Sequence, residues 1–175
     1  ELSRKLDEAI ALPEDALARV RAFLAEVSQA ESERLPAPDA WSIGEIAHHL
    51  VLVTRKFAAL PQIVATQPPD RFDYAGVVAK RRCALPDLAA DKGAAPENVR
   101  PTAGGNIQEL AQELGVAWEG GKAALRSIAE YDLSRYYWEH YRLGPLTLYE
   151  AIALQGYHAL KHLAQMKRTM KELTE

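Results

Sequence analysis

The chain has 175 residues, a hydrophobic fraction of 48% and a formal net charge of -3, which fits a single domain over residues 1–175 with its own core. This slightly acidic balance argues against nucleic-acid binding, and no apolar run approaches the roughly 20 residues of a membrane span. One cysteine, Cys83, excludes an internal disulfide and suits a reducing compartment. Without the features of a signal peptide at its start, the chain is expected to be a cytoplasmic protein.

The first long helix is expected from Pro13 to about Ser32. Apolar residues recur there at helical spacing, namely Ala16, Leu17, Val20, Phe23, Leu24 and Val27. Pro13 suits the first turn of a helix, because its missing amide N–H costs nothing there. A shorter helical lead-in at residues 2–10 should be separated or kinked by this proline.

The second long helix is expected to start at a capping box formed by Ser42 and Glu45. Trp41 precedes the box and is placed to pack as a hydrophobic staple against the first turn. The helix should run to about Leu60, ending near Pro61.

Two adjacent histidines lie on this second helix. His49 shares an apolar stripe with Ile46, Leu50, Val53 and Phe57, and it is therefore expected to point into the core. His48 lies about 100° further round the helix, which places it outward or on a flank.

A long connection follows, from about Thr66 to Gly105, rich in Pro, Asp, Gly and Ala. Structureless loops of this length are uncommon in compact domains, so a short helix is expected between Tyr74 and Leu85. Its basic cluster indicates a solvated face and consists of Lys80, Arg81 and Arg82. Cys83 is interpreted as a buried or half-buried small residue rather than a nucleophile.

The third long helix should begin at Asn106 with Glu109 and continue along an apolar stripe to Ile128. The aromatic-rich connection Tyr136–Tyr141 then either plugs one end of the molecule or lines a ligand site. No strand alternation is expected. A fourth helix follows this connection. The order of the expected helices predicts an all-α four-helix bundle with a long crossover, in which the second and third helices need not be antiparallel neighbours.

The fourth helix should start at a capping box formed by Thr147 and Glu150. On it, His158 and His162 are four residues apart, so both imidazoles project from one face and could hold one metal ion. The alternative is a pair of amphipathic side chains at a helix border, with their tips in water. Together with the core-facing His49, they are expected to place three ring nitrogens around a common point.

Two stretches of the chain resemble the DinB/YfiT-like superfamily. The matching features are the Trp41-Ser42 start of the second helix, the His49-Leu50 pair, the Gly-Pro-Leu-Thr-Leu turn at residues 144–148, and the final pattern of His158, His162, Leu163 and Gln165. The resemblance implies a four-helix bundle in which His49, His158 and His162 bind a divalent metal ion, zinc or nickel. It also implies a small-molecule substrate and, for the thiol-dependent members, a low-molecular-weight thiol as co-substrate.

The activities that the resemblance implies are thiol S-transfer, thiol-dependent isomerisation and metal-dependent hydrolysis. A zincin-type protease is disfavoured, because Ala159, Leu160 and Lys161 leave no glutamate between the two histidines. No separate general base or catalytic side chain is evident, which favours thiol transfer to a small electrophile over hydrolysis. The alternative is a non-catalytic bundle that binds metal or serves a structural or interaction role. A homodimer through an exposed helix face is neither supported nor excluded.

Overall fold

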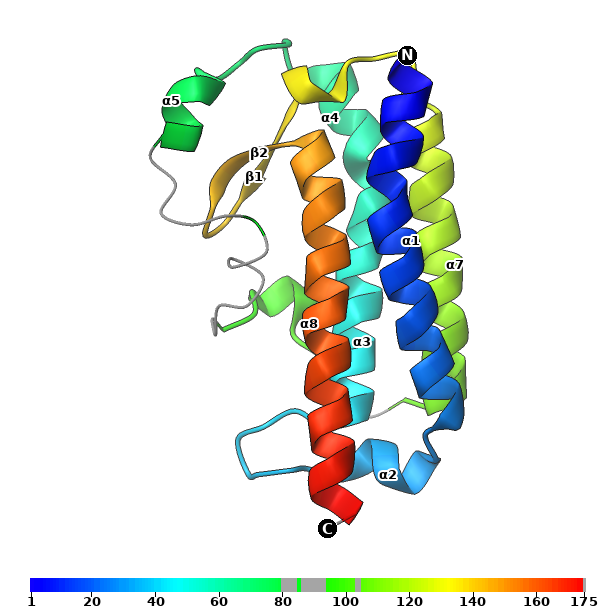
Figure 1. The fold of residues 1–175 in the computed structure, drawn as a ribbon. Helices are drawn as coiled ribbons and strands as arrows, with labels where there is room; N and C mark the ends of the chain where they lie inside the picture. The colour runs from blue at the N-terminus through cyan, green and yellow to red at the C-terminus, as the bar shows by residue number, and fades with distance from the viewer. Residues whose placement is uncertain (80–84, 86–93, 103–104, 175) are drawn as a thin grey trace.

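Four long helices form the body of the molecule in the computed structural model, which describes residues 1–79, 85, 94–102 and 105–174 (Figure 1). They are α1 (Leu2–Glu26), α3 (Ile43–Arg55), α7 (Ile107–Arg126) and α8 (Leu148–Thr174). Helices α1 and α3 each contact both α7 and α8. Figure 1 shows α1 and α8 running in one direction and α3 and α7 in the other. The prediction of an all-α four-helix bundle is therefore confirmed.

The long crossover joins α3 to α7 and explains their relative direction. After α3 the chain forms a 3-10 turn, η1 (Lys56–Ala59), and the short helix α4 (Leu60–Thr66), then α5 (Tyr74–Ala79) and the 3-10 turn η2 (Glu97–Val99). The crossover returns to the opposite end of the bundle, so α3 and α7 are parallel neighbours (Figure 1).

The expected end of the second helix near Leu60 is wrong. The α-helical hydrogen bonding stops at Arg55, and Pro61 lies in the first turn of α4, where its missing N–H is tolerated. Of the expected helix between Tyr74 and Leu85, α5 covers the first six residues. The basic cluster at residues 80–82 and Cys83 lie outside the described residues.

The first helix also differs from expectation, because α1 runs unbroken from Leu2 through Pro13. Leu6, Ile10, Pro13 and Leu17 are all buried on its inner face, so tertiary packing outweighs the hydrogen bond lost at the proline. The helix ends at Glu26 rather than Ser32. A capping box of Ser28 and Glu31 then starts the separate short helix α2 (Gln29–Glu33).

A β-hairpin lies between α7 and α8, where no strand was expected. Strands β1 (Tyr137–His140) and β2 (Gly144–Thr147) pair antiparallel, with His140 opposite Gly144. Gly144 has a φ of 70°, a conformation that glycine adopts without strain. Four residues per strand are too few to show a recognisable alternation, which is why the sequence pattern missed the hairpin.

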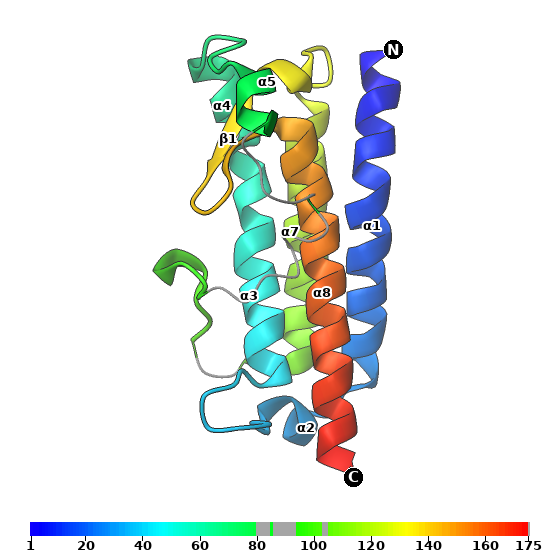
Figure 2. The same cartoon turned by 60° about the vertical axis from the view of Figure 1, so that its left-hand side comes forward.

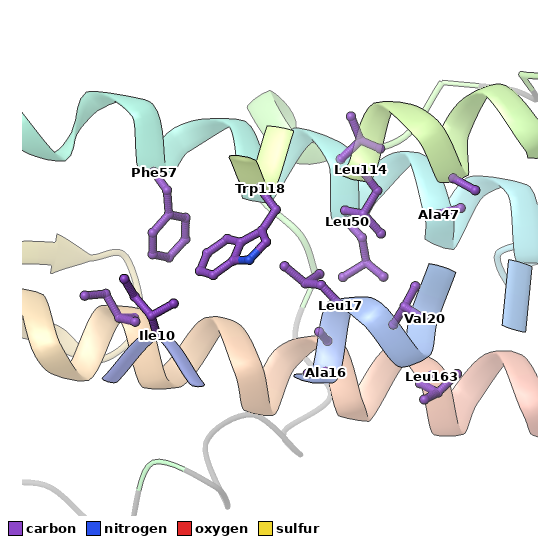
Figure 3. Packing of buried hydrophobic residues seen from close by; sticks show 14 of the residues in the cluster. Ile10, Ala16, Leu17, Val20, Ala47, Leu50, Phe57, Leu114, Trp118 and Leu163 are labelled. Carbon is purple, nitrogen blue, oxygen red and sulfur yellow. The ribbon is translucent and has the colours of Figure 1, made fainter. Parts of the chain in front are cut away.

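All four long helices contribute to the hydrophobic core. Figure 3 shows side chains that meet between the helices, among them Ile10, Ala16, Leu17, Val20, Ala47, Leu50, Leu114, Trp118 and Leu163. At one end Phe57 packs edge-on against Trp118 and against Trp138 of the hairpin, with ring centroids 6.3 and 6.1 Å apart. None of the described helices combines the length and apolar character required to cross a membrane.

Candidate metal centre

Helix α3 presents His49 to the interior of the bundle. The helix starts as expected: the Ser42 hydroxyl accepts the Glu45 N–H at 3.2 Å, and the Ser42 N–H donates to the Glu45 carboxylate at 2.8 Å. This cap fixes the register in which His49 is buried, with only 4% of its surface exposed, while His48 is half-buried. Trp41 lies against the His49 ring at a centroid distance of 5.1 Å.

The second capping box sets the position of helix α8. Glu150 N–H donates to the Thr147 hydroxyl at 3.1 Å, and Thr147 N–H donates to the Glu150 carboxylate at 2.9 Å. Two and three turns further along the helix, His158 and His162 lie on the face turned toward α3. Their rings are edge-on to one another, with centroids 4.5 Å apart.

The three histidines place their Nε2 atoms together. His158 Nε2 lies 3.2 Å from His49 Nε2 and 3.1 Å from His162 Nε2. Three nitrogens bound at zinc–nitrogen distances to one tetrahedral ion would lie about 3.3 Å apart. The cluster therefore has the spacing of a three-histidine metal site, and one ligand atom from each residue lies within 4.8 Å of the others.

The hydrogen bonds at the Nδ1 atoms decide where the imidazole protons lie. His49 Nδ1 is 2.7 Å from the Val99 carbonyl oxygen in η2, and His162 Nδ1 is 2.9 Å from Gln165 Oε1. Both partners are acceptors, so each Nδ1 carries the proton and each Nε2 keeps a lone pair. In metal sites, an acceptor that binds the other ring nitrogen of a histidine orients that ligand.

The third ring, that of His158, cannot donate a hydrogen bond to both the His49 and the His162 Nε2 lone pairs. His158 has at most one N–H at Nε2 when neutral, so at least one of its two close nitrogen contacts brings two lone pairs together. Its Nδ1 is buried and has no hydrogen-bond partner among the residues that the structure describes. A cation shared by the three Nε2 atoms would remove this repulsion, so the residues present fit a divalent metal ion.

Burial keeps the three rings neutral, which is the form that binds metal. Desolvation lowers the pKa of His162 to about 3 and the pKa of His158 well below its usual range. The neighbouring His162 and His49 lower the pKa of His158 further by charge repulsion. Desolvation also lowers the pKa of His49, although its bond to the Val99 carbonyl opposes this shift. Protons therefore compete weakly for the Nε2 atoms at neutral pH.

A cavity of about 440 Å³ opens onto the histidine cluster. Its walls come from α3, α8, the hairpin and the crossover near η2. Figure 2 shows that the hairpin and η2 lie on the side of the bundle away from α1. The aromatic lining residues are Trp41, Phe57, Trp138 and Tyr141. Within the segment Tyr136–Tyr141, Tyr136 is buried in the core and Trp138 lines the cavity.

Among the described residues, the charges that line this cavity are mainly positive. Lys56, Lys161 and Arg142 are among its lining residues. Among the described lining residues Glu139 is the only carboxylate, and it forms an ion pair with Arg71 at 3.2 Å. The cavity should therefore favour a ligand with negative charge.

Sequence reasoning selected the three clustered histidines but missed much of their surroundings. The Val99 carbonyl had no sequence signal, because it lies outside the long periodic helices. His140, which lines the cavity, was covered only by the general expectation for the aromatic segment Tyr136–Tyr141. Gln165, in contrast, stands three residues after His162, a spacing that places the two side chains together on a helix.

The chain also matches a known protein family. The sequence model of the DinB superfamily matches residues 14–166 of the chain, a range that includes all three clustered histidines. No curated protein matches the chain.

Proposed function

The chain belongs to the DinB superfamily, and we propose that it is a metal-dependent thiol transferase acting on small electrophiles. In this proposal His49, His158 and His162 hold a divalent ion, zinc or nickel, and a low-molecular-weight thiol is the co-substrate. The observation that supports it most is the convergence of three Nε2 atoms that hydrogen bonding alone cannot satisfy, on the wall of a cavity large enough for a small molecule.

Three protein ligands leave positions of a divalent ion open for other molecules, as in catalytic rather than structural sites. An ion bound there would lower the pKa of a thiol or water and polarise a substrate oxygen. The protein's own residues shape the site: aromatic rings form part of the walls, and the bonds to Val99 and Gln165 hold two of the imidazoles in place.

Thiol transfer fits the lining of the cavity better than hydrolysis does. In the transfer, a thiol of lowered pKa releases its proton to bulk water, its sulfur forms a bond to carbon of the electrophile, and the leaving group departs with the electron pair of the broken bond. Hydrolysis needs a positioned base to take a proton from water. The one described carboxylate of the lining, Glu139, is exposed and paired with Arg71, so hydrolysis is the second candidate.

The first experiment is a metal titration of protein stripped with a chelator. Zinc at about 100 times its dissociation constant should stabilise the fold by about 2.7 kcal/mol, since the ion binds only the folded site. For a chain of this size that is a rise in Tm of about 5–10 °C. His158→Ala should lose most of this shift, and His48→Ala should keep it.

The second experiment tests catalysis on the metal-loaded protein. Several cellular thiols are incubated with a panel of electrophiles, and both the loss of free thiol and the thioether product are measured. Turnover that depends on metal and is lost in His158→Ala supports the proposal. Metal binding without consumption of any thiol or hydrolysis of any ester would favour a non-catalytic metal-binding bundle. Identical melting of the metal-free and metal-soaked protein would favour a purely structural role.

A further inference from the structure

His140 is a fourth histidine at the cavity, and the proposed metal site does not use it. It is the last residue of β1 and lines the cavity from the hairpin side. Its ring packs near two aromatic neighbours, with centroids 6.1 Å from Trp138 and 4.7 Å from Tyr141. These contacts hold the imidazole at the wall.

The hairpin turn fixes the proton of this ring. The backbone N–H groups of Arg142 and Leu143 both point at His140 Nδ1, each with a nitrogen–nitrogen distance of 3.3 Å. A backbone N–H can only donate, so Nδ1 must accept and cannot carry a proton. Because burial lowers the pKa of His140 to about 4, the ring is neutral at pH 7 and its single proton is on Nε2.

The surroundings of His140 suit a negative charge. Burial is the largest cause of the lowered pKa of His140, and the nearby charges of Arg142 and Lys56 lower it further. Two cations therefore act on the ring. His140 lines the same cavity as the three residues of the histidine cluster. A ligand bonded to His140 would therefore lie beside that cluster and within a positive field.

We propose that His140 is a specificity-determining residue, whose Nε2–H donates a hydrogen bond to a carboxylate of the small molecule that occupies the cavity. The hairpin turn holds the ring in the one tautomer that can donate there, and Lys56 adds a compensating positive charge. The inference names a substrate class, small carboxylates, and rests on the proposed function only in treating the ligand as a substrate.

The tautomer is tested first, on metal-free protein. Long-range ¹H–¹⁵N NMR spectra of the histidine rings should show His140 protonated at Nε2 and unprotonated at Nδ1. A proton on Nδ1 would overturn the proposal, whether or not the protein binds metal.

The ligand preference is tested with two thiols that differ only in charge, 3-mercaptopropionate and 3-mercaptopropionamide. Both are titrated into the metal-free protein by NMR and into the zinc-loaded protein by calorimetry. The carboxylate should bind about tenfold or more tightly than the amide, as expected for a hydrogen bond to a charged group. His140→Leu should lose most of that preference and keep only the smaller part that the cations of the cavity lining supply. His140→Gln should keep most of it, because its amide N–H can donate from a similar position.

The outcomes separate this proposal from the proposed function. Equal binding of the two thiols to the wild type, or an unchanged preference in His140→Leu, overturns the role of His140. A protein that binds no zinc yet prefers the carboxylate in a His140-dependent way contradicts the proposed metal enzyme and supports His140. His48→Ala, altered outside the cavity lining, should behave as the wild type in every titration.

Discussion

Replacing Gly156 with alanine tests how closely α1 and α8 pack beside the histidine cluster. A Cβ at this position would lie 2.5 Å from Leu12 Cγ, 3.0 Å from Pro13 N and 3.1 Å from Leu12 C. Ordinary carbon–carbon contacts are about 3.5–4.0 Å, so the overlap with Leu12 exceeds about 1 Å. Two of the three atoms belong to the backbone of α1, which cannot turn aside as a side chain can. The helices must therefore move apart.

The magnitude follows from two opposed effects. Overpacking costs about 1–3 kcal/mol, whereas alanine in place of glycine within a helix returns about 0.8–1.0 kcal/mol. We expect a net loss of up to about 2 kcal/mol for Gly156→Ala, which lowers Tm by up to about 8 °C in a chain of this size. Because Gly156 stands two residues before His158 on the same helix, zinc affinity should fall as well.

Gly120→Ala is the matched control. Gly120 is an exposed glycine inside α7, and a Cβ there would meet no atom of the described residues within 4 Å. This variant should gain about 0.8–1.0 kcal/mol and leave zinc affinity unchanged. Urea denaturation and zinc calorimetry on both variants decide the matter. If Gly156→Ala were as stable as Gly120→Ala, the close approach of α1 and α8 at this point would be refuted.

Three further predictions concern the histidines and their helix. His49→Ala should weaken zinc binding by more than about 100-fold, because even the loss of a residue that hydrogen-bonds to a metal ligand costs about 10–100-fold. His48→Ala should change stability by less than about 0.5 kcal/mol. The metal content of the purified variants checks both, and loss of metal from the His48 variant instead would show that His48 binds the ion. Thr147→Ala should cost about 0.5–2 kcal/mol by freeing the first amide groups of α8, and an unchanged urea midpoint would show that this cap contributes nothing. The metal-free protein should lose stability as the pH falls below about 6.5, because unfolded imidazoles take up protons there whereas buried rings with lowered pKa values, such as His162 at about 3, do not. Each such ring contributes at most about 1.4 kcal/mol per pH unit to the free energy of unfolding, and this contribution is fully present above pH 6.5. Urea melts at several pH values should show that the free energy of unfolding depends less steeply on pH in His162→Gln.

Local sequence signals determined where the key helices begin. The capping boxes at Ser42 and Thr147 and the Asn106 cap all form as expected. The same holds for the four-residue spacing that brings His158 and His162 onto one face. Each signal joins residues two to four positions apart, and a helix fixes such neighbours by its own geometry. The sequence could therefore specify them without any knowledge of the rest of the fold.

Only the tertiary structure decided what surrounds the histidine cluster. The bond from His49 to the Val99 carbonyl joins residues 50 positions apart, and the short distance between His49 and His158 joins residues 109 apart. Helix α1 continues through Pro13 because the inner face of this helix is buried. The pairing of β1 with β2 brings hairpin residues to the cavity wall, and both strands are too short to show an alternation of apolar and polar residues. Spacing along the chain encodes neighbours within a helix, but contacts between distant segments depend on how the buried faces pack, which no local pattern contains.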